Sequence, residues 1–178
     1  MPFTKLLPSS IDLAQNFTFT GTVAGAGESN TPAFYCTKTS SQTVSDNTKT
    51  KVTWNEVYDT DSAVASDKFT VPSGKAGKYN FYIHLSLGTT GSYGVRFPRA
   101  YIYKNGSSLY MFLGPNNEQG NDVYSVTGTL SLDLSVGDYI EVYGRNSIDQ
   151  GSPQFLGKAG DSPNEERSWW GGYKVWVH

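Results

Sequence analysis

The clearest hydrophobic pattern in the chain runs from residue 78 to residue 87, where apolar and polar side chains alternate with a period of two. In an extended strand such residues point to the same side. The apolar row consists of Tyr79, Phe81, Ile83, Leu85 and Leu87. A helical period would scatter these five side chains around a cylinder, and their aromatic and β-branched character favours a strand. The pattern therefore predicts a long strand with this row buried.

The opposite side of the same strand is neither plainly solvated nor plainly apolar. It carries Asn80, Tyr82, His84 and Ser86. An outer sheet face is normally small, polar and charged, whereas Tyr is enriched where surfaces meet other molecules. We therefore expect this half-polar face to contact a partner.

Several other segments alternate in the same way and are separated by turn residues. The Asn105-Gly106 dipeptide is the strongest hairpin signal, because both residues accept a positive φ. Trp54 is the expected core anchor of its segment. The predicted strands span residues 32–36, 51–57, 69–71, 78–87, 95–104, 107–113, 123–135, 139–143 and 169–177, and residues 144–168 read as a long polar loop. About eight or nine short strands at this spacing predict two packed antiparallel sheets.

Composition narrows the class of protein. Nineteen glycines and 14% aromatic residues fit an antiparallel β protein, and 178 residues suffice for one domain with its own core. A net charge of −2 without a basic run argues against nucleic acid. The sequence lacks a stretch of about 20 apolar residues that could span a membrane. Cys36 is the single cysteine, which excludes an intrachain disulfide, and we interpret it as a small buried side chain rather than a reactive thiol.

The first 30 residues differ from the rest of the chain. They carry large apolar side chains but only a brief alternation, so they cannot bury themselves. One interpretation is a frayed terminus; the other, which we favour, is an arm and linker that docks on a partner chain. Residues 1–27 also lack the features of a secretion signal. The docking residues expected in the arm are Ile11, Leu13, Phe17 and Phe19.

The usual signatures of an enzyme are missing. His84 and His178 are the two histidines, and no nucleophile elbow, phosphate-binding loop or metalloprotease motif is present. Two acidic pairs occur, Asp59 with Asp61 and Glu165 with Glu166. Both lie in polar segments without neighbouring aromatic platforms for sugars, so solvated loop charge explains them better than glycoside hydrolysis. We expect no enzymatic activity.

Six short motifs occur in an order that is typical of one protein family. They are residues 32–34 (PAF), 69–72 (FTVP), 77–81 (GKYNF), 104–106 (KNG), 130–132 with 137–138 (LSL and GD), and the aromatic and glycine-rich segment 170–177. In this order they resemble the complement C1q globular-head family, which is similar in fold to the tumour-necrosis-factor ligands. The resemblance covers residues 31–177 and implies a two-sheet antiparallel jelly-roll domain, residues 31–178, that assembles as a homotrimer.

The resemblance also bears on ion binding and on the origin of the protein. Family heads bind calcium in apical loops, and calcium prefers oxygen ligands; the candidates are Asp59, Asp61, Asn116, Asn117 and Asp122. No other cofactor is expected. The chain has neither the collagen stalk nor the secretion signal of animal members. Its first 30 residues instead resemble attachment segments that precede such heads in tailed-phage virion proteins.

These observations lead to one preferred function and two alternatives. The preferred function is a trimeric, non-enzymatic head on the capsid or tail surface of a phage virion, decorating the capsid or ending a tail fibre that contacts a host glycan or protein. The alternatives are a soluble ligand head that binds a protein receptor and a polysaccharide-degrading enzyme. The resemblance places the threefold axis beside the half-polar face, with Tyr82, His84, Tyr124 and Trp176 as the expected interface residues.

Overall fold

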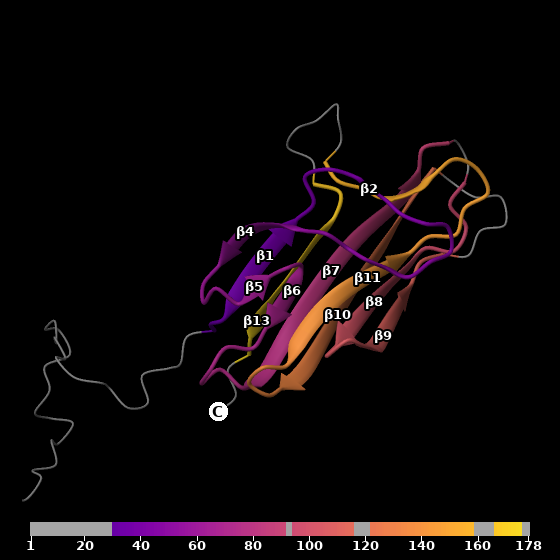
Figure 1. The fold of residues 1–178 in the computed structure, drawn as a ribbon. Helices are drawn as coiled ribbons and strands as arrows, with labels where there is room; N and C mark the ends of the chain where they lie inside the picture. Colours follow the sequence, from indigo (N-terminus) through magenta and orange to yellow (C-terminus); the bar gives the residue numbers. More distant parts are fainter. Residues whose placement is uncertain (1–29, 92–93, 116–121, 159–165, 176–178) are drawn as a thin grey trace, which may run out of the picture.

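The computed structural model describes residues 30–91, 94–115, 122–158 and 166–175. In these residues the regular structure is entirely β, in two antiparallel sheets that face each other, which confirms the predicted fold class (Figure 1). The described part of the chain offers no helix able to cross a membrane.

The first sheet, sheet A, is organised around β7 (Gly77–Thr89). One edge of β7 pairs along its whole length with β10 (Val123–Leu134). The other edge pairs with β13 (Trp169–Lys174) and, further along, with β12 (Pro153–Phe155). The sheet continues from β13 through β1 (Ala33–Thr37) to β4 (Asn55–Asp59), and from β12 to β2 (Gln42–Thr43).

The second sheet, sheet B, has β11 (Tyr139–Arg145) near its centre. On one side β11 pairs with β8 (Arg99–Lys104), which pairs in turn with the edge strand β9 (Ser107–Leu113). On the other side it pairs with β6 (Lys68–Thr70) and β3 (Thr50–Lys51). The short β5 (Val64–Ala65) pairs with β6 and ends this sheet.

The core lies between the sheets, and the organising strand supplies much of it. All five apolar residues predicted on the inner row of β7 are buried, with Tyr79, Leu85 and Leu87 fully so. Sheet B contributes Phe69, Ile102, Ile140 and Val142 from the opposite side. The rings of Phe34 and Phe69 stack across the gap, with centroids 4.9 Å apart. Cys36 is buried in this cluster, as the sequence indicated.

Three predicted boundaries are wrong, for identifiable reasons. Residues 51–57 do not form one strand: the chain leaves sheet B after β3 and enters sheet A at β4, so Trp54 lies at the crossing and is only partly buried. The strand predicted from residue 95 begins at Arg99, because Pro98 has no N–H to donate to a ladder. The predicted loop 144–168 contains β12, whose Phe155 is fully buried.

The Asn105-Gly106 turn is confirmed. Both residues have positive φ, 51° and 77°, as a tight hairpin of this type requires. The side chain of Asn105 ties this hairpin to the next one: its Oδ1 accepts from the backbone N–H of Tyr139 at 2.9 Å, and its Nδ2 donates to Asp138 at 2.7 Å.

The first and last described segments meet at one end of the sandwich. The backbone N–H of Lys174 donates to the carbonyl of Pro32 at 2.9 Å. The predicted arm, residues 1–30, lies outside the described residues except for Asn30, so its docking stays a prediction.

Candidate interaction face

The outer side of sheet A carries a row of aromatic side chains that crosses four strands. Strand register places Trp169 opposite His84, and Tyr82 opposite Gly171, which in turn pairs with Tyr35. Tyr58 then pairs with Tyr35. Residues paired in this way point to the same side of a sheet. We call the set Tyr35, Tyr58, Tyr82, His84 and Trp169 the aromatic face.

His84 lies in the middle of the β7 part of this face. Its ring stacks on Trp169, with centroids 5.3 Å apart and planes 15° apart, and its Nδ1 lies 2.7 Å from the hydroxyl of Thr127. Burial lowers the pKa of His84, because removal from water disfavours the imidazolium form. His84 therefore packs against an aromatic ring and is hydrogen-bonded to a hydroxyl, which fixes its ring within this face.

Gly171 makes room for Tyr82 on this face. A Cβ on Gly171 would meet the ring of Tyr82 and would lie 2.6 Å from the carbonyl oxygen of Phe34. The phenol therefore lies across the bare backbone of β13 toward the tyrosines of the neighbouring strands. Burial, and then the hydroxyl of Tyr58, raise the pKa of Tyr82 to about 12. The sequence motif Trp-Trp-Gly-Gly at residues 169–172 thus shapes the surface as well as the sheet.

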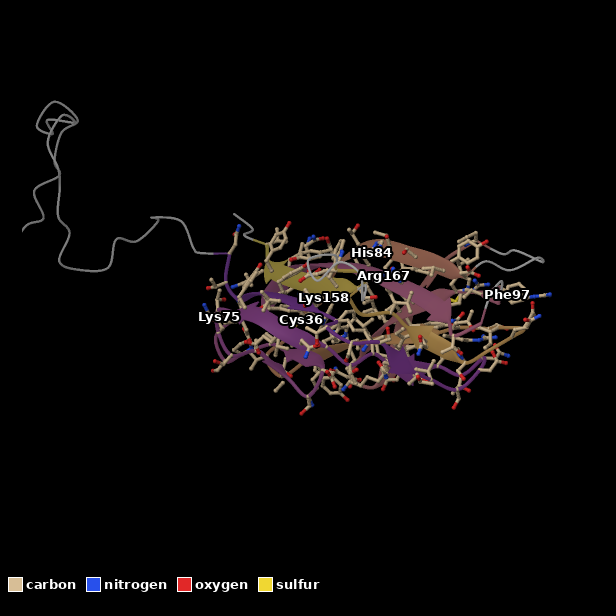
Figure 2. The ribbon with its side chains drawn as sticks, turned by 90° about the horizontal axis from the view of Figure 1, so that it is seen from above. Cys36, Lys75, His84, Phe97, Lys158 and Arg167 are labelled. Carbon is tan, nitrogen blue, oxygen red and sulfur yellow. The ribbon has the colours of Figure 1, made fainter. Side chains whose placement is uncertain are left out.

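The two outer tyrosines continue the row toward the sheet edge. The rings of Tyr35 and Tyr58 stack with centroids 6.2 Å apart. The hydroxyl of Tyr35 donates to Oε2 of Glu166 at 2.7 Å, and burial followed by this carboxylate raises the pKa of Tyr35. The raised pKa keeps the Tyr35 phenol neutral at physiological pH, so Glu166 is the charged group bound at this end of the row. Figure 2 shows His84 and Arg167 close together on the same side of the molecule.

The structure brings together two of the four residues expected at the interface. Tyr82 and His84 lie on the aromatic face as predicted. Tyr124 does not: it pairs with Leu87 and belongs to the inner row of sheet A, so its placement on this face was wrong, while its role in a trimer interface stays a prediction. The error came from assigning faces without knowing the register between strands. Trp176 lies outside the described residues. Sequence reasoning missed Tyr35, Tyr58 and Trp169, although Trp169 lies beside the quoted 170–177 motif.

A second apolar surface lies on the edge strand β9 and the start of β10. Met111 and Leu113 are 50% and 62% exposed, and Leu109, Tyr110 and Val123 are exposed as well. Met111 and Leu113 pair with Tyr101 and Arg99 and so lie on the outer side of sheet B, whereas Tyr110 pairs with Ile102 on its inner side. Together the five side chains make this edge of the sandwich apolar. We call them the edge patch. The edge patch and the aromatic face lie on different strands, so they are two separate surfaces.

The calcium candidates divide into three kinds. Asp59 is used by its own loop, accepting the backbone N–H of Asp61 at 3.2 Å and of Val64 at 2.6 Å. Asp61 is bound to Lys75 in an ion pair of 3.3 Å. Asn116 and Asn117 lie outside the described residues, whereas Asp122 is exposed. Within the described ranges no three His, Cys, Asp or Glu side chains gather as a metal site would require.

The acidic pairs likewise show no catalytic arrangement in the described residues. Asp59 and Asp61 are engaged as above, Glu166 accepts from Tyr35, and Glu165 lies outside the described residues. Cys36 lines a cavity of about 230 Å³ with Trp54, Glu56 and Asp67. Burial, and then nearby Glu56, raise the pKa of this thiol to about 12, so it stays protonated and unreactive at neutral pH.

One buried cation stands out. Lys38, just after β1, is only 2% exposed. Its ammonium donates to the carbonyl and hydroxyl oxygens of Thr53, both at 3.0 Å, and to Oε1 of Gln42 at 3.3 Å. These acceptors are neutral, and burial lowers the pKa of Lys38 to about 8. The lysine joins β1 to the crossing segment around Trp54, a structural role.

Comparisons with known proteins support the fold and only the fold. No family model and no curated protein sequence matches the chain. Among solved structures, the globular domain of zebrafish complement 1qA matches with a TM-score of 0.55 and 17% identity, covering 83% of this chain and 99% of that one. Murine APRIL at pH 5.0 gives 0.54 and 16%, covering 80% and 98%. Eiger TNF from S. frugiperda gives 0.51 and 17%, covering 82% and 93%.

These likenesses run over nearly the whole length of each neighbour at identities too low to carry function. They agree with the observed architecture, two antiparallel sheets with the aromatic face on the outside of one of them. The chain therefore has the jelly-roll fold of C1q and tumour-necrosis-factor heads.

Proposed function

We propose that the protein is a non-enzymatic binding head that works as a homotrimer. The observation that carries this proposal is the aromatic face, a row of five aromatic side chains on the outside of a sheet, in which Tyr35 stacks on Tyr58, His84 stacks on Trp169 and Tyr82 is tilted against Trp169. Tyr and Trp are enriched in interfaces because they bury much area while keeping a polar atom to pair. A solvated outer face has no need of such a row.

The edge patch supplies the complementary surface. In the trimer, the aromatic face of one copy packs against β9 and the start of β10 of the next copy. Two different surfaces in contact make a head-to-tail interface, which closes into a ring when the rotation is a third of a turn. Both surfaces are rich in aromatic or apolar side chains, and the Glu166 carboxylate at the aromatic face accepts a hydrogen bond from Tyr35. The family resemblance supplies the threefold symmetry.

Light scattering on the purified protein tests the trimer. We expect the mass of three chains at micromolar concentration. Tyr82→Glu places like charges near the axis, and Leu113→Glu places a charge in the edge patch; both variants should dissociate while the mass of Val136→Glu, an exposed turn control, is unchanged. A monomeric wild-type mass, or trimers in both interface variants, would contradict the proposal.

The second part of the proposal is that the head belongs to a phage virion and is attached through its first residues. Its support is the resemblance of that segment to virion attachment segments, together with its apolar residues Phe17 and Phe19. Deleting residues 1–27 should leave a folded trimer that no longer joins the particle. Truncated protein that is incorporated normally would remove the arm from the mechanism.

A further inference from the structure

The outer side of sheet B carries side chains of a different kind from the aromatic face. Tyr139 and Tyr143 alternate along β11 with the buried Ile140 and Val142. Register with β8 and β6 places Tyr101, Tyr103 and Lys68 on the same outer side. We call Tyr103, Tyr139, Tyr143, Lys49 and Lys68 the tyrosine–lysine face.

Each lysine of this face is held over a ring. The ammonium of Lys49 lies 4.5 Å from the ring centroid of Tyr101, and that of Lys68 lies 4.7 Å from the ring centroid of Tyr139. Between them the rings of Tyr103 and Tyr143 stack at 4.1 Å. Such contacts fix the direction of a flexible lysine without neutralising it. The face therefore presents positioned cations beside partly exposed phenols.

Not every ammonium group on this side of sheet B has a carboxylate partner among the described residues. Lys51 and Lys104 each form an ion pair, with Glu141 and Asp138, both at 2.8 Å. In the part of the chain that the structure describes, Lys49 and Lys68 have no carboxylate within salt-bridge distance, and Arg145 donates to the neutral Asn47. The face is thus locally positive in a protein of net charge −2. Its complement is an anion.

The spacing of the two lysines indicates an extended ligand. The ammonium of Lys49 lies over Tyr101, which pairs with Tyr143, and that of Lys68, whose backbone pairs with Glu141, extends to the ring of Tyr139. Four residues along a strand span about 13 Å. One sugar ring or one small anion does not reach both lysines, whereas a linear polymer laid along β11 does.

We propose that the tyrosine–lysine face binds an acidic polysaccharide, a polymer of uronic acid sugars. Its carboxylates would pair with the two positioned ammonium groups, and the apolar sides of its sugar rings would contact the phenol rings between them. Single-stranded nucleic acid fits less well, because the chain has a net charge of −2 and no basic run. An acidic peptide lacks the flat ring that the stacked tyrosines would meet. This inference rests on the proposed role as a binding head and names its ligand class.

The test is binding of a polygalacturonate oligosaccharide to the full chain, measured by calorimetry at low salt. We expect Lys49→Gln combined with Lys68→Gln to weaken binding about tenfold, since two exposed charge pairs are lost. Lys78→Gln combined with Lys158→Gln removes the same charge from exposed lysines elsewhere and should leave the affinity within about twofold. Tyr103→Thr, which keeps a strand-forming residue, should weaken binding about threefold at high salt as well as low, because a ring contact is not screened.

The outcomes separate this site from the proposed function. No binding by the wild-type chain, or equal loss in the two double variants, would overturn the site while leaving the trimer mass untouched. Oligothymidylate that binds as tightly as the polyuronate would overturn the choice of ligand. A shortened oligosaccharide after incubation would instead contradict the non-enzymatic function. Binding retained by the dissociated Tyr82→Glu variant would support a site complete within one chain.

Discussion

The outer faces of the two sheets both lie on antiparallel strands, but they differ in charge. On sheet A Tyr35 stacks on Tyr58, His84 stacks on Trp169 and Tyr82 is tilted against Trp169, and raised pKa values keep Tyr35 and Tyr82 neutral. On sheet B the tyrosines lie under lysines. A neutral aromatic surface is suited to close contact with another copy of the protein, because burying it leaves no charge unpaired. A surface with positioned cations is suited to a charged, water-exposed ligand.

The largest expected effect comes from breaking the core that both faces share. Phe81 is 1% exposed and contacts the rings of Phe34, Phe69 and Tyr79. Phe81→Ala should lower the free energy of unfolding by about 3 to 5 kcal/mol, because a cavity replaces a packed ring. Urea unfolding of this variant and of Val136→Ala, an exposed control, measures the difference. Unchanged stability would contradict the buried inner row.

A variant with a smaller effect on stability should distinguish the role of the aromatic face from that of the tyrosine–lysine face. Gly171→Ala puts a methyl group against the Phe34 carbonyl and the Tyr82 ring, so β1 and β13 must shift, at a cost of about 1 to 3 kcal/mol. We expect weaker trimers on dilution, followed by light scattering, and unchanged polyuronate affinity. Thr129→Ala is the matched control, because Thr129 on β10 pairs with Tyr82 and lies on the same outer side of sheet A. If Gly171→Ala weakened polyuronate binding and left the trimer intact, the assignment of the two faces would be reversed.

The third prediction contrasts the buried lysine beside sheet A with the exposed lysines of sheet B. The pKa of Lys38 is about 8 in the folded chain and about 10.5 when unfolded, so between these values the unfolded state holds more protons. The titration of Lys38 therefore makes the free energy of unfolding increase as the pH rises from 8 toward 10. Above pH 10 the phenols of Tyr35, Tyr79 and Tyr82 act in the opposite direction, since their pKa values are raised by burial.

Comparison with Lys38→Met isolates this effect. The variant should be less stable overall, because three oxygen acceptors lose their donor, and it should lack the rise of about 1 to 3 kcal/mol between pH 8 and 10. Thermal melting across that range measures the slope. Lys49→Met, whose ammonium is exposed over Tyr101, should keep the wild-type slope. Parallel slopes for wild type and Lys38→Met would show that Lys38 does not titrate in this range.

The sequence by itself determined the fold class and most strands, because these depend on local chemistry. Alternation along residues 78–87 fixes which side chains of β7 face the core, and Asn105-Gly106 fixes a turn through backbone conformations that few residues adopt. The outer residues Tyr82 and His84 were recognised for the same reason, because alternation along a strand separates its two faces.

Only the tertiary structure decided how strands combine into surfaces. Register between strands is set by the packing of both sheets, and a shift of one residue moves a side chain to the other face, which is why Tyr124 was misplaced and Trp169 was missed. The crossing from β3 to β4 and the short β12 depend on contacts with distant segments, which no local pattern records. The tyrosine–lysine face has the same origin: Lys49, Lys68 and their tyrosines come from four separate segments and meet only because sheet B aligns them.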